Sequence, residues 1–233
     1  MIEITYRSDM TVNLIDSMAS DKAVAMAARV STGAETTDDP SKDVGLINYL
    51  MRDRHGSPFE HNAFTFFIEA PIFVFREFMR HRIASYNEES GRYKELSPVF
   101  YTPDVSRKLV QVGKPGAYTF EDGDQEQYEA VDNAIFVASE DAYARYQDML
   151  DEGIAREVAR MVLPLNIYSS MYVTMNARSL MNFLSLRTTR EGTHFPSFPQ
   201  REIEMVAEKM EEFFAEKMPI TYETFNKNGR VAP

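Results

Sequence analysis

The chain has 233 residues, of which 44% are hydrophobic and 26% charged. This composition is typical of a globular protein and argues against disorder over most of the chain. The net charge of -11 disfavours a nucleic-acid scaffold, although a local group of arginines can still bind a small anion. Because the chain has no cysteine, disulfides, thiolate metal sites and thiolate nucleophiles are excluded. The N-terminus has no apolar signal-peptide core and no apolar run approaches ~20 residues, which predicts a cytoplasmic protein without membrane contact.

The N-terminal part of the chain predicts one strand and two helices. Residues 2–7 alternate apolar and polar side chains, as a half-buried strand does. Residues 20–30 predict a helix that begins at a Ser or Asp cap, and residues 43–53 predict a second helix with one apolar face. The intervening residues 31–42 are rich in Thr, Gly, Asp and Pro and predict a loop.

The next segment is rich in aromatic residues. Residues 55–61 (HGSPFEH) have the Ser, Pro and Glu spacing of a helix start, with Ser57 as the expected cap. Residues 62–69 predict a buried strand, and residues 71–82 predict a helix that begins at its proline.

Beyond residue 98 the patterns predict mainly helices. They predict, in chain order, a surface loop at 99–124, helices at 125–151 and 154–163, a strand at 167–175, a helix at 177–187, a Gly/Pro loop at 188–199 and a helix at 200–216. The sequence therefore predicts an α+β chain in which helices dominate.

Residues 80–93 (RHRIASYNEESGRY) are the densest candidate for chemistry. Arginine is the preferred partner of phosphate because its planar guanidinium donates two parallel hydrogen bonds. Ser90 and Gly91 can add hydroxyl and backbone N–H donors, and Glu88 can accept from a ribose hydroxyl or a ring N–H. The simpler alternative is an ion-paired surface loop in which glutamates 88 and 89 neutralise these arginines, and such pairs contribute little to stability.

The order and spacing of this string resemble the motif of the flavin-dependent thymidylate synthases, in which Arg-His-Arg is followed after seven residues by Ser. Here these residues are Arg80, His81, Arg82 and Ser90. Four further blocks resemble the same family in the same order: HGSPFEH at 55–61, PIFVFREFM at 71–79, AREVARMVLPLN at 155–166 and NARSLMNFLSLR at 176–187. The absence of cysteine also fits, because this family needs no thiolate nucleophile.

The resemblance implies reductive methylation of dUMP to dTMP. The expected carbon donor is 5,10-methylenetetrahydrofolate, and the expected hydride donor is FADH2, which NADPH regenerates. It further implies one α+β domain over residues 1–233, with a mixed sheet core and helical layers, and a homotetramer with shared active sites. The expected ligands are thus dUMP, folate, FAD and NADPH, without nucleic acid, membrane or metal.

The resemblance also assigns roles to individual residues. Arg187 matches the catalytic arginine, whose charge near the uracil carbonyls would favour the electron-rich ring. The expected cofactor-binding residues are His55, Ser57, Arg80, His81, Arg82, Glu88, Asn176, Arg178 and Asn182. The expected dUMP-binding residues are Glu77, Arg80, Glu88, Ser90, Gly91, Arg92, Arg160 and Arg187.

Each of these residues also has a structural interpretation. Arg160 and Arg178 could be salt-bridged surface groups, and Arg187 could complement the dipole at a helix end. Residues 188–196 are longer than the corresponding stretch of many family members, so the role of His194 stays open, and Glu77 stands where some members have Gln. A non-catalytic nucleotide- or flavin-binding homologue is the main alternative function, and a purely structural helical oligomer is a third.

Overall fold

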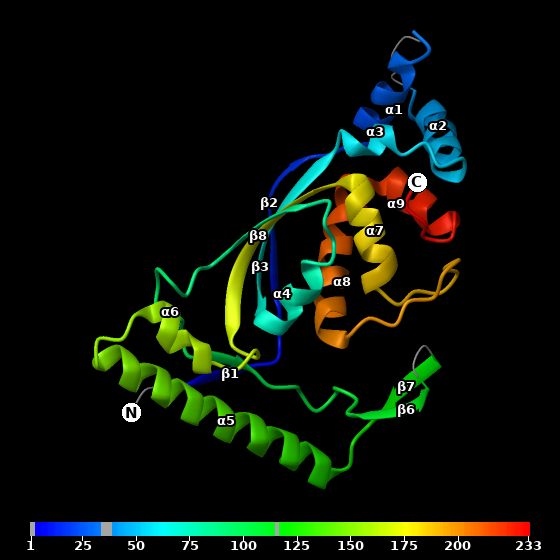
Figure 1. The fold of residues 1–233 in the computed structure, drawn as a ribbon. Helices are drawn as coiled ribbons and strands as arrows, with labels where there is room; N and C mark the ends of the chain where they lie inside the picture. The colour runs from blue at the N-terminus through cyan, green and yellow to red at the C-terminus, as the bar shows by residue number, and fades with distance from the viewer. Residues whose placement is uncertain (1–2, 34–38, 115–116) are drawn as a thin grey trace. The chain divides into compact units, whose positions relative to one another are not determined.

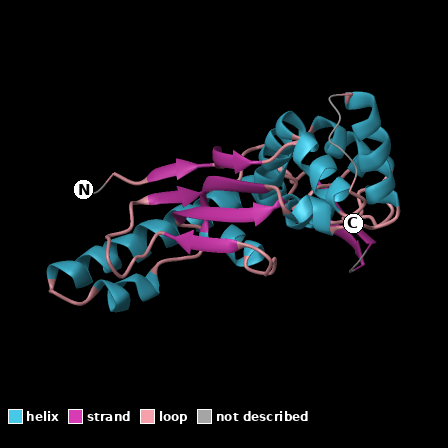
Figure 2. Cartoon of the chain, turned by 90° about the horizontal axis from the view of Figure 1, so that it is seen from above, coloured by secondary structure: helices cyan, strands magenta, loops and turns pink. Residues whose placement is uncertain are grey.

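The computed structural model describes residues 3–33, 39–114 and 117–233, and these form two compact units. Unit 1 comprises Met1–Met10, Glu69–Glu77 and Glu88–Ser170, and unit 2 comprises Thr11–Ile68, Phe78–Asn87 and Met171–Pro233. Each unit is therefore assembled from segments that are far apart in the sequence. Figure 1 colours these segments by residue number, and Figure 2 shows that helices make up much of the chain.

A four-stranded sheet contributes most of its residues to unit 2. Its strands lie in the order β2 (Thr11–Met18), β3 (Ala63–Pro71), β8 (Tyr168–Asn176) and β4 (Ser85–Glu88). Alternate residues of β3 are buried, as a strand with one covered face requires. On the covered face Phe64 and Phe66 meet Phe214 and Phe213 of α8 (Arg201–Lys217), with ring centroids 6.0 and 6.2 Å apart.

The opposite face of this sheet remains partly exposed. Thr65 and Thr174 bring their hydroxyl oxygens within 3.0 Å of each other across β3 and β8, and Phe67 meets Tyr172 edge to face. Tyr172 is nevertheless 45% exposed and Ile15 is 49% exposed. Large apolar side chains therefore remain in contact with solvent on this face of a single chain.

The other helices of unit 2 begin at residues that suit helix starts. They are α1 (Asp21–Val30), α2 (Pro40–Arg52), α3 (Ser57–Glu60), α7 (Ala177–Arg187) and α9 (Pro219–Lys227). Ser20 caps α1 by accepting from the Ala23 N–H, and Asp39 caps α2 by accepting from the Ser41 N–H. The carboxylate of Asp21 accepts from the N–H groups of Ile220 and Thr221, which joins α1 to the start of α9.

Unit 1 is built around the long helix α5 (Gln125–Asp151). Asp124 and Gln127 form a capping box at its start. The remaining elements of this unit are β1 (Thr5–Arg7), α4 (Ile72–Phe78, except its last residue), β5 (Val99–Tyr101), β6 (Val110–Lys114), β7 (Ala117–Glu121), α6 (Arg156–Ala159) and the 3₁₀ turn η1 (Arg160–Val162). Strands β1 and β5 pair in parallel, and β6 and β7 form an antiparallel hairpin.

The structure confirms the α+β class and most of the predicted helices. The helices predicted at 125–151 and 177–187 have the expected bounds. The predicted loop at 99–124 is wrong, because strands β5, β6 and β7 lie in it. The helix predicted at 71–82 ends at Phe78, and neither β2 nor α9 was predicted.

One detail of the predictions needs correction, and three stretches of the chain lie outside the described residues. Ser57 is not the cap of α3, because Gly56 occupies that position and makes no side-chain capping bond. Residue 2 of the first predicted strand, residues 34–38 of the predicted loop and residues 115–116 lie outside the described residues. Within the described part of the chain, no helix is long and apolar enough to cross a bilayer.

Candidate functional site

A cavity of about 460 Å³ in unit 2 gathers much of the Arg-His-Arg motif and of α7. The motif contributes Arg80, His81 and Arg82, and α7 contributes Arg178, Asn182 and Arg187. Arg178 and Asn182 share a helix face because they are four residues apart. Asn176, by contrast, is the cap of α7, and its side-chain oxygen accepts from the Ser179 N–H at 2.8 Å.

Buried aromatic residues hold the Arg-His-Arg turn in place. Phe78 at the end of α4 is fully buried and stacks on Phe183 of α7, with centroids 4.8 Å apart. The Tyr86 hydroxyl lies 2.9 Å from the Phe78 carbonyl oxygen and 2.7 Å from that of His81, and donates to them. The helix therefore ends at a fixed point, and the three motif side chains follow from it.

His81 and Arg187 are joined directly. The Arg187 Nε–H donates to His81 Nε2 at 3.1 Å, and the His81 ring packs against the edge of Phe183. Burial, together with the Arg187 charge, lowers the pKa of His81 to about 4. The imidazole is therefore neutral at pH 7, with its proton on Nδ1, and it fixes the direction of Arg187 without cancelling its charge.

The arginines of this cavity differ in their partners. Arg80 and Arg82 are exposed and have neither an ion pair nor a hydrogen bond with any residue that the structure describes. Arg178 donates to Glu60 at 2.6 Å and to the Pro233 carbonyl oxygen, so its salt-bridged interpretation is correct in this structure. Unpaired guanidinium groups on a cavity wall can accept an anionic ligand without first losing a partner.

A second cavity, of about 320 Å³, lies in unit 1. Its polar wall includes Glu88, Glu89, Glu157, Arg160 and Ser169, Gly91 lies beside them, and the other lining residues are apolar. The pKa of the Glu88 carboxyl is raised, chiefly by burial, and the Ser169 hydroxyl and the Arg160 charge partly oppose this rise. Arg160 forms no salt bridge with any described residue, so its salt-bridged interpretation is wrong.

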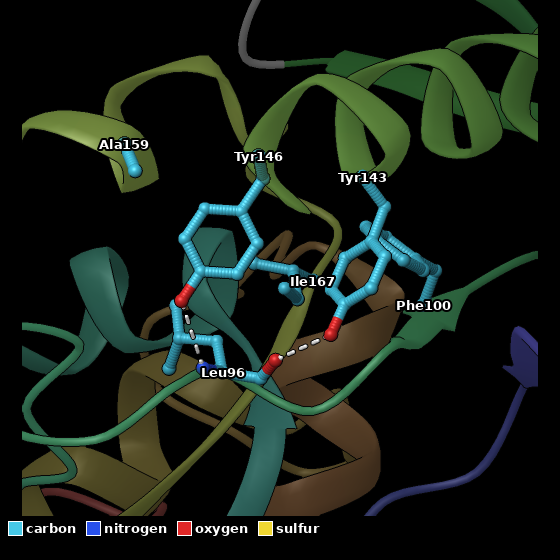
Figure 3. Close-up of a cluster of buried hydrophobic side chains, with 6 residues drawn as sticks. All are labelled: Leu96, Phe100, Tyr143, Tyr146, Ala159 and Ile167. Atoms are coloured by element: carbon cyan, nitrogen blue, oxygen red, sulfur yellow. Dashed lines mark hydrogen bonds between the residues drawn. The ribbon is translucent and has the colours of Figure 1, made fainter. Parts of the chain in front are cut away.

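The apolar wall of this cavity belongs to a compact core, which Figure 3 shows. Leu96 is held at both backbone groups: the Tyr146 hydroxyl accepts from its N–H at 3.2 Å, and the Tyr143 hydroxyl donates to its carbonyl at 3.0 Å. A Cβ at Gly91 would lie 3.1 Å from a Leu96 methyl group and 3.2 Å from Arg160 Cδ. Glycine thus lets the backbone approach both side chains closely.

Six expected site residues line neither cavity. Arg92 pairs with Glu157 at 3.0 Å, and Ser90 Oγ accepts from the Arg92 N–H at 3.4 Å. His55 is exposed and stacks on Tyr49, Ser57 is exposed at the start of α3, and Glu77 is half-buried on α4. Asn176, the sixth, is the α7 cap already described.

The ion-paired alternative for residues 80–93 does not match the observed contacts. Glu89 pairs with Lys94 at 2.8 Å, and Arg92 pairs with Glu157 rather than with a glutamate of the string. Sequence reasoning missed several polar residues of the cavities, among them Arg54, Glu60 and Ser179 in unit 2 and Glu157 and Ser169 in unit 1. The only signal for Ser169 was a pair of serines inside an otherwise apolar strand.

The fold and the unit 2 cavity, whose wall carries five arginines, define an α+β protein with a site whose charge suits an anionic ligand. The family model described as "Thymidylate synthase complementing protein" matches residues 13–220. A flavin-dependent thymidylate synthase of Streptomyces coelicolor is 63% identical over 99% of this chain and 96% of its own length. One from Tropheryma whipplei is 59% identical over 100% of this chain and 99% of its own length. The chain belongs to the flavin-dependent thymidylate synthase family.

A solved structure agrees with this assignment. A UMP/dUMP methylase, PolB from Streptomyces cacaoi bound with 5-Br dUMP, superposes with a TM-score of 0.94 at 54% identity. The match covers 99% of this chain and 100% of that chain. The same methylase bound with 5-Br UMP superposes with a TM-score of 0.93.

Proposed function

We propose that this chain methylates dUMP to dTMP, with 5,10-methylenetetrahydrofolate as carbon donor, FAD as bound cofactor and NADPH as reductant. The observation that carries the proposal is the presence, in a member of this family, of two cavities whose walls hold arginines without a salt bridge to any described residue: Arg80 and Arg82 in unit 2 and Arg160 in unit 1. Since the family model spans both units, we further propose that the chain acts as a single functional domain.

The unit 2 cavity is the proposed FAD site. The guanidinium groups of Arg80, Arg82 and Arg178 suit a pyrophosphate, and Asn182 supplies both a donor and an acceptor for a flavin ring or ribose. FAD, when bound and reduced, supplies the hydride. Arg178 would exchange its exposed pair with Glu60 for the cofactor, which costs little because both groups are about half exposed. The assignments of His55, Ser57, Glu88 and Asn176 to the cofactor stay proposals.

The unit 1 cavity is the proposed dUMP site. Arg160 can bind the phosphate, and Glu88 can accept from a sugar hydroxyl or from the ring N–H. Arg92 and Ser90 can join Arg160 once the exposed pair between Arg92 and Glu157 opens. Glu77, Gly91 and Arg80 complete the proposed nucleotide set.

Arg187 is the proposed catalytic residue. Its charge near the uracil carbonyl oxygens would stabilise the negative charge that develops as C5 becomes nucleophilic. A guanidinium cannot act as a base at neutral pH, so the role is electrostatic. Neutral His81 supports it, because a hydrogen bond from Arg187 Nε leaves the guanidinium fully charged and oriented.

We also propose a homotetramer with active sites shared between copies. The partly exposed sheet face, with Tyr172 and Ile15 about half exposed, supports a partner surface there. Sharing would let residues of different copies meet at one FAD and one dUMP. A cytoplasmic location stays a prediction from the sequence.

The test is anaerobic turnover of purified protein with FAD, NADPH, dUMP and methylenetetrahydrofolate, with dTMP assayed directly. Product that requires all four components supports the proposal. Bound flavin and tight dUMP binding without product would instead favour the non-catalytic homologue. UMP belongs in the same assay, because a methylase described as acting on UMP and dUMP is 54% identical to this chain.

A further inference from the structure

Ser169 is a buried polar residue on the wall of the unit 1 cavity. Ser169 is the second residue of β8 and is only 4% exposed, and it lines the unit 1 cavity. Its hydroxyl oxygen makes no hydrogen bond of normal geometry with any described residue. A buried hydroxyl in this state destabilises the fold, so its presence calls for an explanation outside the folded chain.

The neighbours of Ser169 indicate what the missing partner is. Ser169 and Glu88 both line this cavity, and the Ser169 hydroxyl lies near the Glu88 carboxyl: it opposes the rise in that group's pKa caused by burial, although the contact lacks normal hydrogen-bond geometry. A carboxylate beside this point repels a phosphate but accepts from a ligand hydroxyl, whose oxygen can in turn accept from Ser169. Arg160, on the same cavity wall, supplies the positive charge for a phosphate.

We propose that Ser169 is a nucleotide-binding residue that donates to the 3′-hydroxyl of the deoxyribose, while that hydroxyl donates to Glu88. The proposal rests on the proposed function, since it takes dUMP as the ligand of the unit 1 cavity. It makes Ser169 a positioning residue for the sugar rather than a group that takes part in the chemistry. It also explains why a polar side chain occupies a site where alanine would fit the apolar surroundings.

The proposal predicts that a Ser169→Ala variant of the full-length, FAD-loaded protein is more stable than wild type but binds dUMP more weakly. Without nucleotide the variant should melt about 2–4 °C above wild type, because an unsatisfied buried hydroxyl is gone. With dUMP its Kd should be about 3- to 10-fold weaker, because a hydrogen bond to the ligand is lost. A purely structural serine would lower the melting temperature when removed, and that result would overturn the proposal.

Ser139→Ala is the matched control. Ser139 lies in the same unit and is 1% exposed, but its hydroxyl already accepts from the Asn166 side chain at 3.3 Å. This variant should lower the melting temperature and leave the Kd for dUMP unchanged. If Ser169→Ala, like this control, has the wild-type Kd for dUMP, the proposed role of Ser169 is refuted.

A ligand that lacks the 3′-hydroxyl locates the contact. With 2′,3′-dideoxyuridine monophosphate, wild type and Ser169→Ala should bind within about 2-fold of each other, since neither can form the bond. An equal loss on both nucleotides would overturn the sugar assignment. Wild-type turnover is measured first. A wild-type protein that neither binds nor methylates dUMP would overturn the proposed function itself. Normal wild-type activity together with an unchanged Kd for dUMP in Ser169→Ala would overturn only the role of Ser169.

Discussion

At the residue scale, His81 orients Arg187 through a hydrogen bond from a neutral ring that brings no opposing charge. A carboxylate in place of His81 would hold Arg187 equally well but would neutralise its charge. A neutral imidazole orients the guanidinium through one hydrogen bond of 3.1 Å and leaves it positive. The sequence placed both residues at the site, but their contact joins positions 106 apart and could not be inferred from local spacing.

Replacement of Arg187 should separate chemistry from cofactor binding. We expect Arg187→Ala to lower kcat by about 10²-fold or more, because stabilisation of developing charge is lost. The flavin absorbance spectrum should persist, since Arg80 and Arg82 still line the cavity. Arg145→Ala, which removes an exposed arginine of α5, is the control and should have wild-type kcat. Wild-type turnover in Arg187→Ala would refute the catalytic role.

The depressed pKa of His81 predicts a specific acid sensitivity. The pKa of His81 is about 4 in the folded chain, and its ordinary value is 6.5. Between pH 4 and pH 6.5, His81 is therefore protonated in the unfolded chain but not in the folded chain. This contribution to stability is complete above pH 6.5 and is lost as the pH falls toward 4. Melting temperatures measured from pH 7.5 to 4.5 should therefore fall more steeply for wild type than for His81→Gln, which accepts from Arg187 without titrating. Parallel curves would contradict the assignment.

At the scale of elements, the start of α7 lets two roles of Asn176 be separated. Its oxygen caps the helix, so Asn176→Ala should lower the free energy of unfolding by about 1 kcal/mol in chemical denaturation. Asn176→Ser keeps a capping oxygen and should retain most of that stability. If the carboxamide also binds FAD, the serine variant will hold flavin more weakly than wild type at equal stability. Equal flavin affinity would limit Asn176 to capping.

The segment before β5 makes Gly91 intolerant of a side chain. A Cβ there would lie 3.1 Å from the side chain of Leu96, whose backbone is held by two tyrosines of α5, and 3.2 Å from Arg160 Cδ, so Gly91→Ala should shift one of these side chains. We expect a loss of about 1–3 kcal/mol in unfolding free energy, together with weaker dUMP binding. Gly45→Ala is the control, because nothing lies within 4 Å of its Cβ. It should stabilise α2 by about 0.5–1 kcal/mol.

Periodicity predicted several elements that bury one face, but it missed α9, in which Thr221, Thr224 and Phe225 are buried. Helix α8 and strand β3 each have a covered side, and their patterns were clear. The strands β6 and β7 have five residues each, and their alternation spans only residues 110–112 and 118–120, which is too short to stand out among the neighbouring Gly and Pro residues, so the hairpin was taken for a loop. The end of α4 at Phe78 depends on the contact with Phe183 of α7, which no local pattern contains.

At the scale of the whole molecule, the proposed tetramer should depend on the partly exposed sheet face. A charge there would remain solvated in one chain but would be buried between copies, so we expect Tyr172→Lys to yield smaller species in sedimentation velocity. Flavin should be lost with them if the sites are shared. Glu212→Lys, on the exposed side of α8, should sediment as wild type does. An intact Tyr172→Lys tetramer would place the interface elsewhere.

The tyrosine contacts at Leu96 have a consequence for inhibition. A compound that fills the unit 1 cavity rests against a wall whose position is set by Tyr143 and Tyr146, and neither tyrosine lines the cavity. Mutations that confer resistance to such a compound should therefore arise in α5 as well as in residues that contact the compound. Tyr143→Phe or Tyr146→Phe would remove one of the two hydrogen bonds to the Leu96 backbone and so change the shape of the wall. Resistance screening of this enzyme should include both tyrosines.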